Sequence, residues 1–261
     1  MGSMAEIRRV LVLGAKGTLG GQLMRLYPKA IGWDREDVDV RDDAALRARL
    51  DGLGFLPCAV VNCVAFNDVD GAEDRSEQAF ALNAEFPGRL AQWTKEKGIP
   101  LVHYSTNYVF DGSLEEYRES DAPAPLSVYG RSKWRGEQLV AENGGQWYVV
   151  RTAVIFGPKG ASELSKKSFV EIMVDLAAGT RDLLEAAPPP GIYHVSNCGC
   201  ASWYDLAREI YRIVGRSTTV LPVPATRFPR KAKRPARAIL LNTRLAPLRP
   251  WQEALADFLS S

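Results

Sequence analysis

Few features of this sequence point to a metalloprotein, a disulfide-bonded protein or a membrane protein. The 261 residues include only four cysteines and two histidines. No uninterrupted apolar run approaches the roughly 18 residues that a membrane-spanning helix needs. The formal net charge of +2 gives no overall attraction to nucleic acid or to a membrane surface. We therefore expect no bound metal, no nucleic-acid partner, no membrane partner and a cytoplasmic location.

The cysteines have ordinary structural explanations. Cys58 and Cys63 lie in or beside an apolar segment, where thiols behave as small buried hydrophobic groups. Cys198 and Cys200 have the spacing of half a metal site, but no second pair of ligands completes it. We expect structural thiols rather than metal ligands.

Short apolar runs alternate with segments of helical pattern over the first 155 residues. The expected strands are residues 9–13, 30–34, 58–65, 100–105 and 146–155. This alternation predicts an α/β fold, a doubly wound, Rossmann-like parallel sheet with right-handed crossovers. The last third is rich in proline and breaks into short elements. We expect a dinucleotide-binding domain over residues 5–157. A smaller C-terminal substrate-binding lobe is expected over residues 158–261, with some elements returning to the main sheet.

A glycine-rich turn follows the first predicted strand. Gly14, Gly17 and Gly20 stand between that strand and a helix, where a backbone without side chains approaches the phosphates of a dinucleotide. A plain turn with no ligand is the competing interpretation. Asp34, at the end of the next strand, has the position of an acid that binds a ribose hydroxyl. Arg35 beside it suits a 2′-phosphate instead, so both NADH and NADPH stay open.

Tyr129 and Lys133 form the sharpest chemical signal. Four residues apart on a helix, they share one face. The ammonium is expected to lower the pKa of the tyrosine from about 10 toward working pH, which suits proton transfer to a carbonyl that receives hydride. Thr106, at the end of a preceding strand, is the candidate for a second hydroxyl on that carbonyl, or else a residue that caps the next turn. Asn83 either supports the site from its helix or faces solvent.

The Gly-x-x-Gly-x-x-Gly spacing resembles the extended short-chain dehydrogenase/reductase superfamily, and further motifs resemble the dTDP-4-dehydrorhamnose reductase family. These motifs span nearly the whole chain, at residues 62–73, 103–112, 125–133, 136–137, 150–152, 191–197, 203–205, 234–235 and 241–243. The resemblance implies reduction of the 4-keto group of a dTDP-linked 6-deoxy sugar by NADPH or NADH. The expected partner is thus a nucleotide sugar, and a homodimer is possible.

The glycine turn and the resemblance together imply a cofactor site. Its expected members are Gly14, Lys16, Gly17, Thr18, Leu19, Gly20, Asp34, Arg35, Asp39, Val40, Cys63, Val64, Ala65, Phe66, Tyr129 and Lys133. The resemblance makes Tyr129 the proton donor, with Lys133 and Thr106 as the other catalytic residues. Thr106, Asn107 and Val154 are the expected substrate contacts. Two of them depart from the family, which usually has Asp at 107 and Trp at 154, so reduction is better supported than rhamnose as the product.

Two other functions are compatible with parts of this pattern. Nucleotide-sugar dehydratases resemble the same fold but carry Thr-Asp-Glu where this chain has Thr106, Asn107 and Tyr108, without an acid pair to eliminate water. A dinucleotide-binding regulatory subunit, like that of methionine adenosyltransferase, also resembles the family and is not excluded. A basic run at residues 227–237 is either a solvated loop or a partner for the diphosphate of a nucleotide sugar.

One segment of the family pattern is absent. Family members carry roughly 25 further residues, over the substrate pocket, after the helix that matches residues 169–178. Here residues 176–180 run straight into 181–185, which resemble the end of a later helix. A deletion of a strand and its crossover would expose core, so we hypothesise a mobile segment at this point. It would appear as a gap between Ala177 and Arg181 well beyond the ~3.8 Å between successive Cα atoms. An unbroken chain would leave a truncated pocket and weaken the case for a working reductase.

Overall fold

The computed structural model describes residues 9–153 and 174–260. Within these ranges the centre of the molecule is a six-stranded sheet in the order β2-β1-β3-β4-β6-β7, with every neighbouring pair parallel. The strands are β1 Val10–Leu13, β2 Ile31–Trp33, β3 Ala59–Asn62, β4 Leu101–Thr106, β6 Trp147–Thr152 and β7 Gly191–His194. The doubly wound parallel fold expected from the sequence is confirmed.

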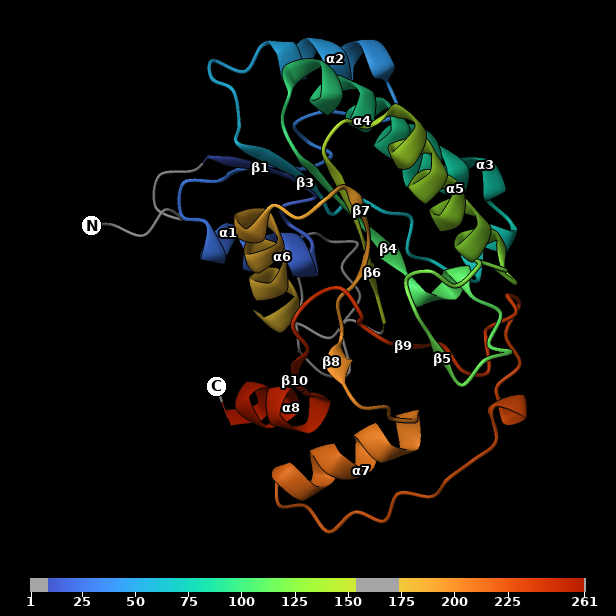
Figure 1. Ribbon diagram of the computed structural model, residues 1–261. Coiled ribbons are helices and arrows are strands. Elements are labelled where there is room, and N and C mark those ends of the chain that lie inside the picture. The colour runs from blue at the N-terminus through green and yellow to red at the C-terminus, as the bar shows by residue number, and fades with distance from the viewer. Residues whose placement is uncertain (1–8, 154–173, 261) are drawn as a thin grey trace.

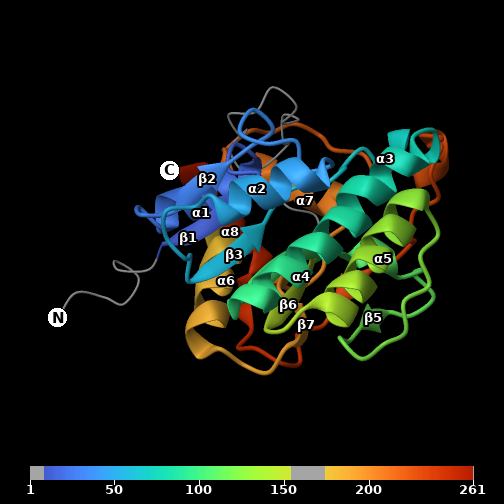
Figure 2. The same cartoon turned by 90° about the horizontal axis from the view of Figure 1, so that it is seen from above.

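Helices cover both faces of the sheet (Figures 1 and 2). Helices α1 Thr18–Leu26 and α6 Val174–Ala186 contact each other on one face. Helices α2 Asp43–Asp51, α4 Phe86–Lys97 and α5 Val128–Asn143 lie on the other. The short helix α3 Ser76–Phe80 continues through a π-helical turn at Ala81–Glu85 into α4. No helix of the described residues has the length and apolar character to cross a membrane.

The strands alternate their side chains between two hydrophobic layers. Val10 and Val12 pack with α1 and α6, whereas Leu11 and Leu13 pack with α2 and α4. All four are almost fully buried. Because successive residues of a strand point to opposite faces, a strand covered on both sides must be apolar throughout. This requirement explains the continuous apolar runs in the sequence.

Local capping signals set the ends of the helices that carry the site. Ser127 caps α5, accepting a hydrogen bond from the Gly130 N–H at 3.1 Å. Asp42 caps α2 in the same way through the Ala45 N–H at 3.0 Å. Helix α4 ends at Gly98, whose φ of 66° places it in the left-handed region that favours glycine.

Smaller elements, all but β5 from the chain after β7, lie below the main sheet in Figure 1. Strand β8 Asn197–Cys198 pairs with β10 Leu248–Pro250, and β5 Glu116–Tyr117 pairs with β9 Ile239–Leu240. The remaining elements are α7 Trp203–Ile213, α8 Trp251–Ser260 and three 3₁₀ turns, η2 Gly71–Glu73, η4 Asn107–Val109 and η5 Ala225–Arg227. Because α6 and β7 belong to the main layers, residues beyond 157 contribute to both parts of the molecule. The division into two domains at residue 157 stays a prediction.

The expected gap between Ala177 and Arg181 is wrong, because these residues lie inside the continuous helix α6. The Thr180 hydroxyl donates to the Leu176 carbonyl at 2.8 Å and is also hydrogen-bonded to the Tyr104 hydroxyl. Leu176, Ala177, Thr180 and Leu183 are buried. Their i, i+1, i+4, i+7 spacing is that of one helix face. Residues 176–180 and 181–185 therefore belong to one helix with a single register. Together they bury a continuous apolar stripe.

Close backbone contact between α5 and the π-helical turn generates a stability prediction. A Cβ on Gly136 would lie 2.0 Å from the Asn83 carbonyl oxygen, a rigid backbone atom. We expect Gly136→Ala to lower the free energy of unfolding by about 1–3 kcal/mol, as overpacking does. Gly21→Ala is the matched helical control, since its Cβ would meet only the Ala15 oxygen at 3.9 Å. Urea unfolding of both variants checks this, and equal stabilities would contradict it.

Candidate active site

The glycine turn after β1 has a shape that only glycine permits. Gly14 has a φ of 79°. A Cβ on Gly20 would lie 2.1 Å from the Gly14 oxygen, and one on Gly14 would lie 3.1 Å from backbone atoms of Cys63 and Val64. Gly17 precedes α1 and provides no side-chain cap for its first N–H groups. These uncapped donors and the open backbone fit the diphosphate of a dinucleotide.

The predicted cofactor residues gather around this turn. Thr18 and Leu19 begin α1, and the half-buried segment 63–66 follows β3 beside the turn. Burial raises the pKa of the Cys63 thiol, which keeps it neutral. Asp34, directly after β2, accepts a hydrogen bond from the Lys16 backbone N–H at 3.0 Å. The end of β2 is thus tied to the glycine turn.

Asp39 and Val40 lie in the loop between β2 and α2. The Arg41 guanidinium hydrogen-bonds to Asp39 and lowers the pKa of this carboxyl to about 2. Arg89 on α4 donates to the Val40 carbonyl at 3.0 Å. The loop is therefore fastened to α4, and the Asp39 carboxylate is already paired within the protein.

Thr106 and Tyr129 lie at the carboxyl end of β4. Thr106 is the last residue of β4 and Tyr129 lies in the first turn of α5, and the Thr106 side chain is near enough to affect the pKa of Tyr129. The Thr106 hydroxyl also accepts a hydrogen bond from the Tyr108 N–H at 3.2 Å, so it caps the next turn. Lys133, one turn further along α5, donates from its Nζ to the Tyr104 carbonyl two residues before Thr106. All three predicted catalytic side chains are buried. The structure brings the three side chains to the carboxyl end of β4, and their convergence on one carbonyl oxygen and their roles stay predictions.

Burial controls the protonation of this cluster. It raises the pKa of Tyr129 to about 12, against the opposing effect of the Thr106 hydrogen bond. The expectation that the pKa of Tyr129 falls below about 10 is therefore wrong for this structure, because desolvation of the phenolate outweighs the effects that oppose it. Tyr129 is a protonated phenol at neutral pH, which is the form that donates a proton. Burial also lowers the pKa of Lys133 to about 8, opposed by the Glu137 carboxylate.

A buried ion pair lies behind Lys133. Glu137, one turn after it on α5, accepts two hydrogen bonds from the Arg151 guanidinium at 2.7 and 3.0 Å. The Ser105 hydroxyl also donates to Glu137, at 2.5 Å. Glu137 and Arg151 are 3% and 1% exposed, so their charges act in a medium that screens weakly. This arrangement joins α5 to β4 and β6 directly beneath the catalytic cluster.

Asn83 supports the site and does not face solvent. Its side-chain oxygen accepts from the Phe66 N–H at 2.8 Å, and its amide nitrogen donates to the Phe66 carbonyl at 3.1 Å and to the Ser132 hydroxyl at 2.9 Å. The side chain thus connects the loop after β3 to α5. It lies in the π-helical turn, a local distortion frequent at functional sites.

Glu73 is a supporting residue that the sequence-based analysis missed. Its carboxylate accepts a hydrogen bond at 2.8 Å from the Val128 N–H, one residue before Tyr129. This contact satisfies one of the free N–H groups at the start of α5. The two residues are 55 positions apart, so no local pattern in the sequence indicates the contact.

The predicted substrate residues are only partly within the described structure. The Asn107 side chain donates to the Ala238 carbonyl at 2.9 Å, which ties it to the C-terminal lobe. Tyr108 packs edge-to-face on Tyr129, with ring centroids 5.7 Å apart. Val154 lies outside the described residues.

The basic run is held by acidic side chains of the protein. Arg234 makes a two-pronged ion pair with Asp70, at 2.8 and 3.0 Å, and Lys231 pairs with Asp74. Arg237 contacts Glu115 at 3.2 Å. All three residues are ion-paired within the protein, but Lys231 and Arg237 are 54% and 62% exposed, so the solvated loop is not contradicted.

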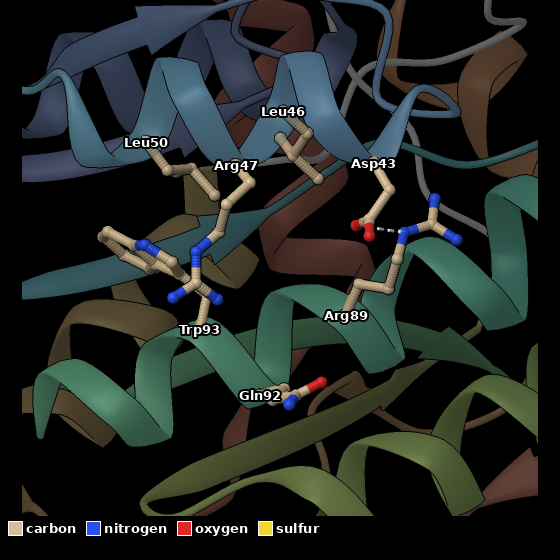
Figure 3. Close-up of a pocket in the computed structure, with 7 residues that line it drawn as sticks. All are labelled: Asp43, Leu46, Arg47, Leu50, Arg89, Gln92 and Trp93. Carbon is tan, nitrogen blue, oxygen red and sulfur yellow. Dashed lines mark ion pairs between the residues drawn. The ribbon is translucent and has the colours of Figure 1, made fainter.

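A hollow of about 260 Å³ lies away from the cluster, between α2 and α4. Figure 3 shows its lining, including the ion pair between Asp43 and Arg89 at 3.1 Å. None of the predicted site residues lines it. Among the described residues, no group of three or more His, Cys, Asp or Glu side chains is arranged to hold a metal ion.

A Rossmann-like parallel sheet, a glycine turn at the start of α1 and a Tyr-x-x-x-Lys pair beside a strand-end threonine define a short-chain dehydrogenase/reductase. The family model described as the RmlD substrate binding domain matches residues 8–187 and 175–261. The chain belongs to this family, that of dTDP-4-dehydrorhamnose reductase.

Relatives and solved structures agree with this assignment. The chain is 36% identical to dTDP-4-dehydrorhamnose reductase of Streptomyces griseus, over 95% of this chain and 92% of the relative. It is 34% identical to the spore coat polysaccharide biosynthesis protein SpsK of Bacillus subtilis (strain 168), over 96% of each chain. A crystal structure of dTDP-4-dehydrorhamnose reductase from Bacillus anthracis str. Ames in complex with NADP has a TM-score of 0.88 and 28% identity, covering 97% of this chain and 99% of that one.

The comparisons also locate the shortening of the chain. The alignment with the Streptomyces griseus relative runs over 284 positions against 261 residues here, so at least 23 positions of it have no counterpart in this chain. The two matches to the family model overlap at residues 175–187, a range that includes nearly all of helix α6. Helix α6 therefore takes the place of two family segments, as the sequence pattern indicated, but without a break in the chain.

The buried Lys133 generates a pH-dependent prediction. An unfolded lysine titrates near 10.4, and the folded-state pKa of Lys133 is about 8. The folded protein thus binds fewer protons than the unfolded chain between these values, and its stability falls as the pH falls through this window. Lys133→Met lacks this dependence. Between about pH 7 and about pH 10 we expect the wild type to gain about 2 kcal/mol relative to the variant.

Urea unfolding of both proteins across that pH range measures the difference. Changes from other titrating groups are common to both proteins and cancel in the comparison. Parallel pH profiles would show that the Lys133 ammonium is solvated and would contradict the buried geometry.

Proposed function

We propose that the protein is an NAD(P)H-dependent reductase of the 4-keto group of a nucleotide-linked 6-deoxyhexose, of the dTDP-4-dehydrorhamnose reductase type. The observation that carries this proposal is the burial of Thr106, Tyr129 and Lys133 together where β4 ends and α5 begins, with Lys133 held on the Tyr104 carbonyl. Two hydroxyls placed in this way can both bind one carbonyl oxygen. Family membership supplies the class of substrate.

The cofactor and the residues of this chain would have separate roles in the reduction. NADH or NADPH, when bound at the glycine turn, supplies a hydride to the carbonyl carbon. Thr106 and Tyr129 hold the carbonyl oxygen, and Tyr129 transfers its proton to this oxygen as the negative charge develops. The ketone thereby gains one hydride and one proton and becomes an alcohol.

Lys133 is proposed to assist proton transfer from the buried Tyr129 by supplying a positive charge near it. After donation Tyr129 is a phenolate, which burial disfavours strongly, as its pKa of about 12 shows. With a pKa of about 8, Lys133 is mostly an ammonium at neutral pH and stabilises that phenolate. The Glu137 carboxylate favours the charged lysine from the same helix. Glu137 thus helps to keep Lys133 protonated next to Tyr129 although Lys133 is buried.

The names of the relatives support a dTDP-linked ketosugar. Besides dTDP-4-dehydrorhamnose reductases, they include a probable dTDP-4,6-dihydroxy-2-methyloxan-3-one 4-ketoreductase of Streptomyces antibioticus and a dTDP-4-keto-6-deoxy-D-glucose reductase of Streptomyces niveus. Asn107 differs from the usual aspartate on the substrate side. An assay panel of dTDP-, GDP- and UDP-linked 4-keto hexoses with both reduced cofactors would identify the sugar and the base.

A regulatory, non-catalytic role is the second candidate. It is favoured only by the general resemblance, and retention of Thr106, Tyr129 and Lys133 favours an enzyme. Turnover of a 4-keto sugar nucleotide with consumption of NADH or NADPH separates the two. A homodimer and a cytoplasmic location stay predictions.

Tyr129→Phe tests the proposed proton donor. The substitution removes the transferable proton but keeps the ring that packs against Tyr108. We expect the rate of ketosugar reduction to fall by about 10²- to 10⁴-fold. Binding of NADH, followed by its fluorescence, should change by less than about threefold, because the glycine turn is untouched.

Tyr211→Phe, on α7, is the matched control and should retain the wild-type rate. A Tyr129→Phe enzyme with wild-type turnover would remove Tyr129 from the mechanism. Loss of NADH binding in that variant would instead assign the tyrosine to the cofactor site.

A further inference from the structure

The loop after β2 holds a carboxylate in a fixed position. One oxygen of Asp34 accepts the Lys16 backbone N–H at 3.0 Å, and the other accepts the Arg35 backbone N–H at 2.9 Å. The Asp34 N–H itself donates to the Asp37 carboxylate at 2.8 Å. Asp34 therefore stays at the end of β2, where an acid of a dinucleotide site binds the ribose 2′-hydroxyl.

A second carboxylate, that of Glu36, contacts both cations beside Asp34. Lys16 Nζ lies 3.1 Å from one Glu36 oxygen, and Arg35 Nε lies 3.8 Å from the other. The backbone of Glu36 itself and the Lys16 side chain hold the pKa of this carboxyl below its usual value. Glu36 is thus an anion that faces a different cation with each oxygen.

This arrangement bears on the difference between the two nicotinamide cofactors. A 2′-phosphate adds a charge of nearly −2 and is usually bound by arginine or lysine side chains. Here Lys16 and Arg35 are engaged by Glu36, while the Asp34 carboxylate does not move away. A 2′-phosphate would meet two carboxylates and would have to compete with Glu36 for each cation.

We propose that Glu36 determines cofactor specificity and makes this site prefer NADH to NADPH. The inference rests on the proposed function only in requiring that the glycine turn binds a dinucleotide. A structure at 28% identity was crystallised with NADP. The preference for NADH is therefore argued from this chain's own side chains and not from family membership. The decision lies with the charged side chains of this chain around Asp34.

The test uses two probes that differ only in the phosphate, ADP-ribose and 2′-phospho-ADP-ribose. Their binding to the full chain is measured by isothermal titration calorimetry at low ionic strength. We expect the wild type to bind ADP-ribose at least about tenfold more tightly. Glu36→Gln should narrow this ratio by about five- to tenfold through tighter binding of the phosphorylated probe. Its affinity for ADP-ribose should stay within about twofold of the wild type.

Two controls separate a local from a general charge effect. Glu209→Gln removes the same charge from α7, where Glu209 pairs with Arg212 at 2.6 Å, and should leave the ratio unchanged. Lys16→Met tests whether Glu36 acts by engaging this cation. In the Glu36→Gln background it should weaken 2′-phospho-ADP-ribose by about fivefold, because Lys16 is then released to the phosphate.

The outcomes distinguish this inference from the proposed function. Equal or tighter binding of the phosphorylated probe to the wild type overturns the NADH preference. An unchanged ratio in Glu36→Gln removes Glu36 as its cause. Failure of both probes to bind means that the glycine turn is not a dinucleotide site, and the proposed function then fails as well.

Discussion

The site depends on the burial of the Lys133 ammonium against the end of β4. Only close approach of α5 to the sheet allows Lys133 to reach the Tyr104 carbonyl while Tyr129 lies near Thr106. Glycines on α5 make this approach possible. A Cβ at Gly130 would lie 2.3 Å from the Tyr108 backbone carbonyl oxygen. The catalytic motif is thus also a packing motif, since its small residues set the depth at which its charged residue is buried.

A buried cation placed in this way requires anions and rigid neighbours. Glu137 supplies the negative charge, and Arg151 balances Glu137 from β6. Asn83 fixes the distance between α5 and the loop after β3, because its one side chain bonds to Phe66 on one side and to Ser132 on the other. The loop after β3, which is predicted to bind the cofactor, and Tyr129, the predicted proton donor, are therefore positioned by the same small group of buried polar side chains.

The parts that could be predicted from the sequence are those with local signals. Apolar runs predicted the strands, the glycine spacing predicted the turn before α1, and the four-residue spacing predicted that Tyr129 and Lys133 share a face. Contacts between distant residues left no such signal, as the ion pair between Asp70 and Arg234 shows, whose members are 164 positions apart. The direction of the Tyr129 pKa was missed for the same reason. The burial of the Tyr129 ring depends on all the residues packed around it, whereas the local sequence indicates only the neighbouring Lys133.

The shortening at α6 affects the substrate side more than the chemistry. Thr106, Tyr129 and Lys133 all precede α6, as does the glycine turn. Among the described strands, β7 lies at the edge of the sheet, so residues lost just before it leave the order of the inner strands intact. The fused helix keeps an apolar face in register, which removes the main energetic objection to a deletion. By the resemblance, the absent segment covers the substrate pocket. The unbroken α6 therefore counts against a complete sugar site and weakens the case for the family's own reaction, while the predicted reduction residues keep their places because all of them precede α6.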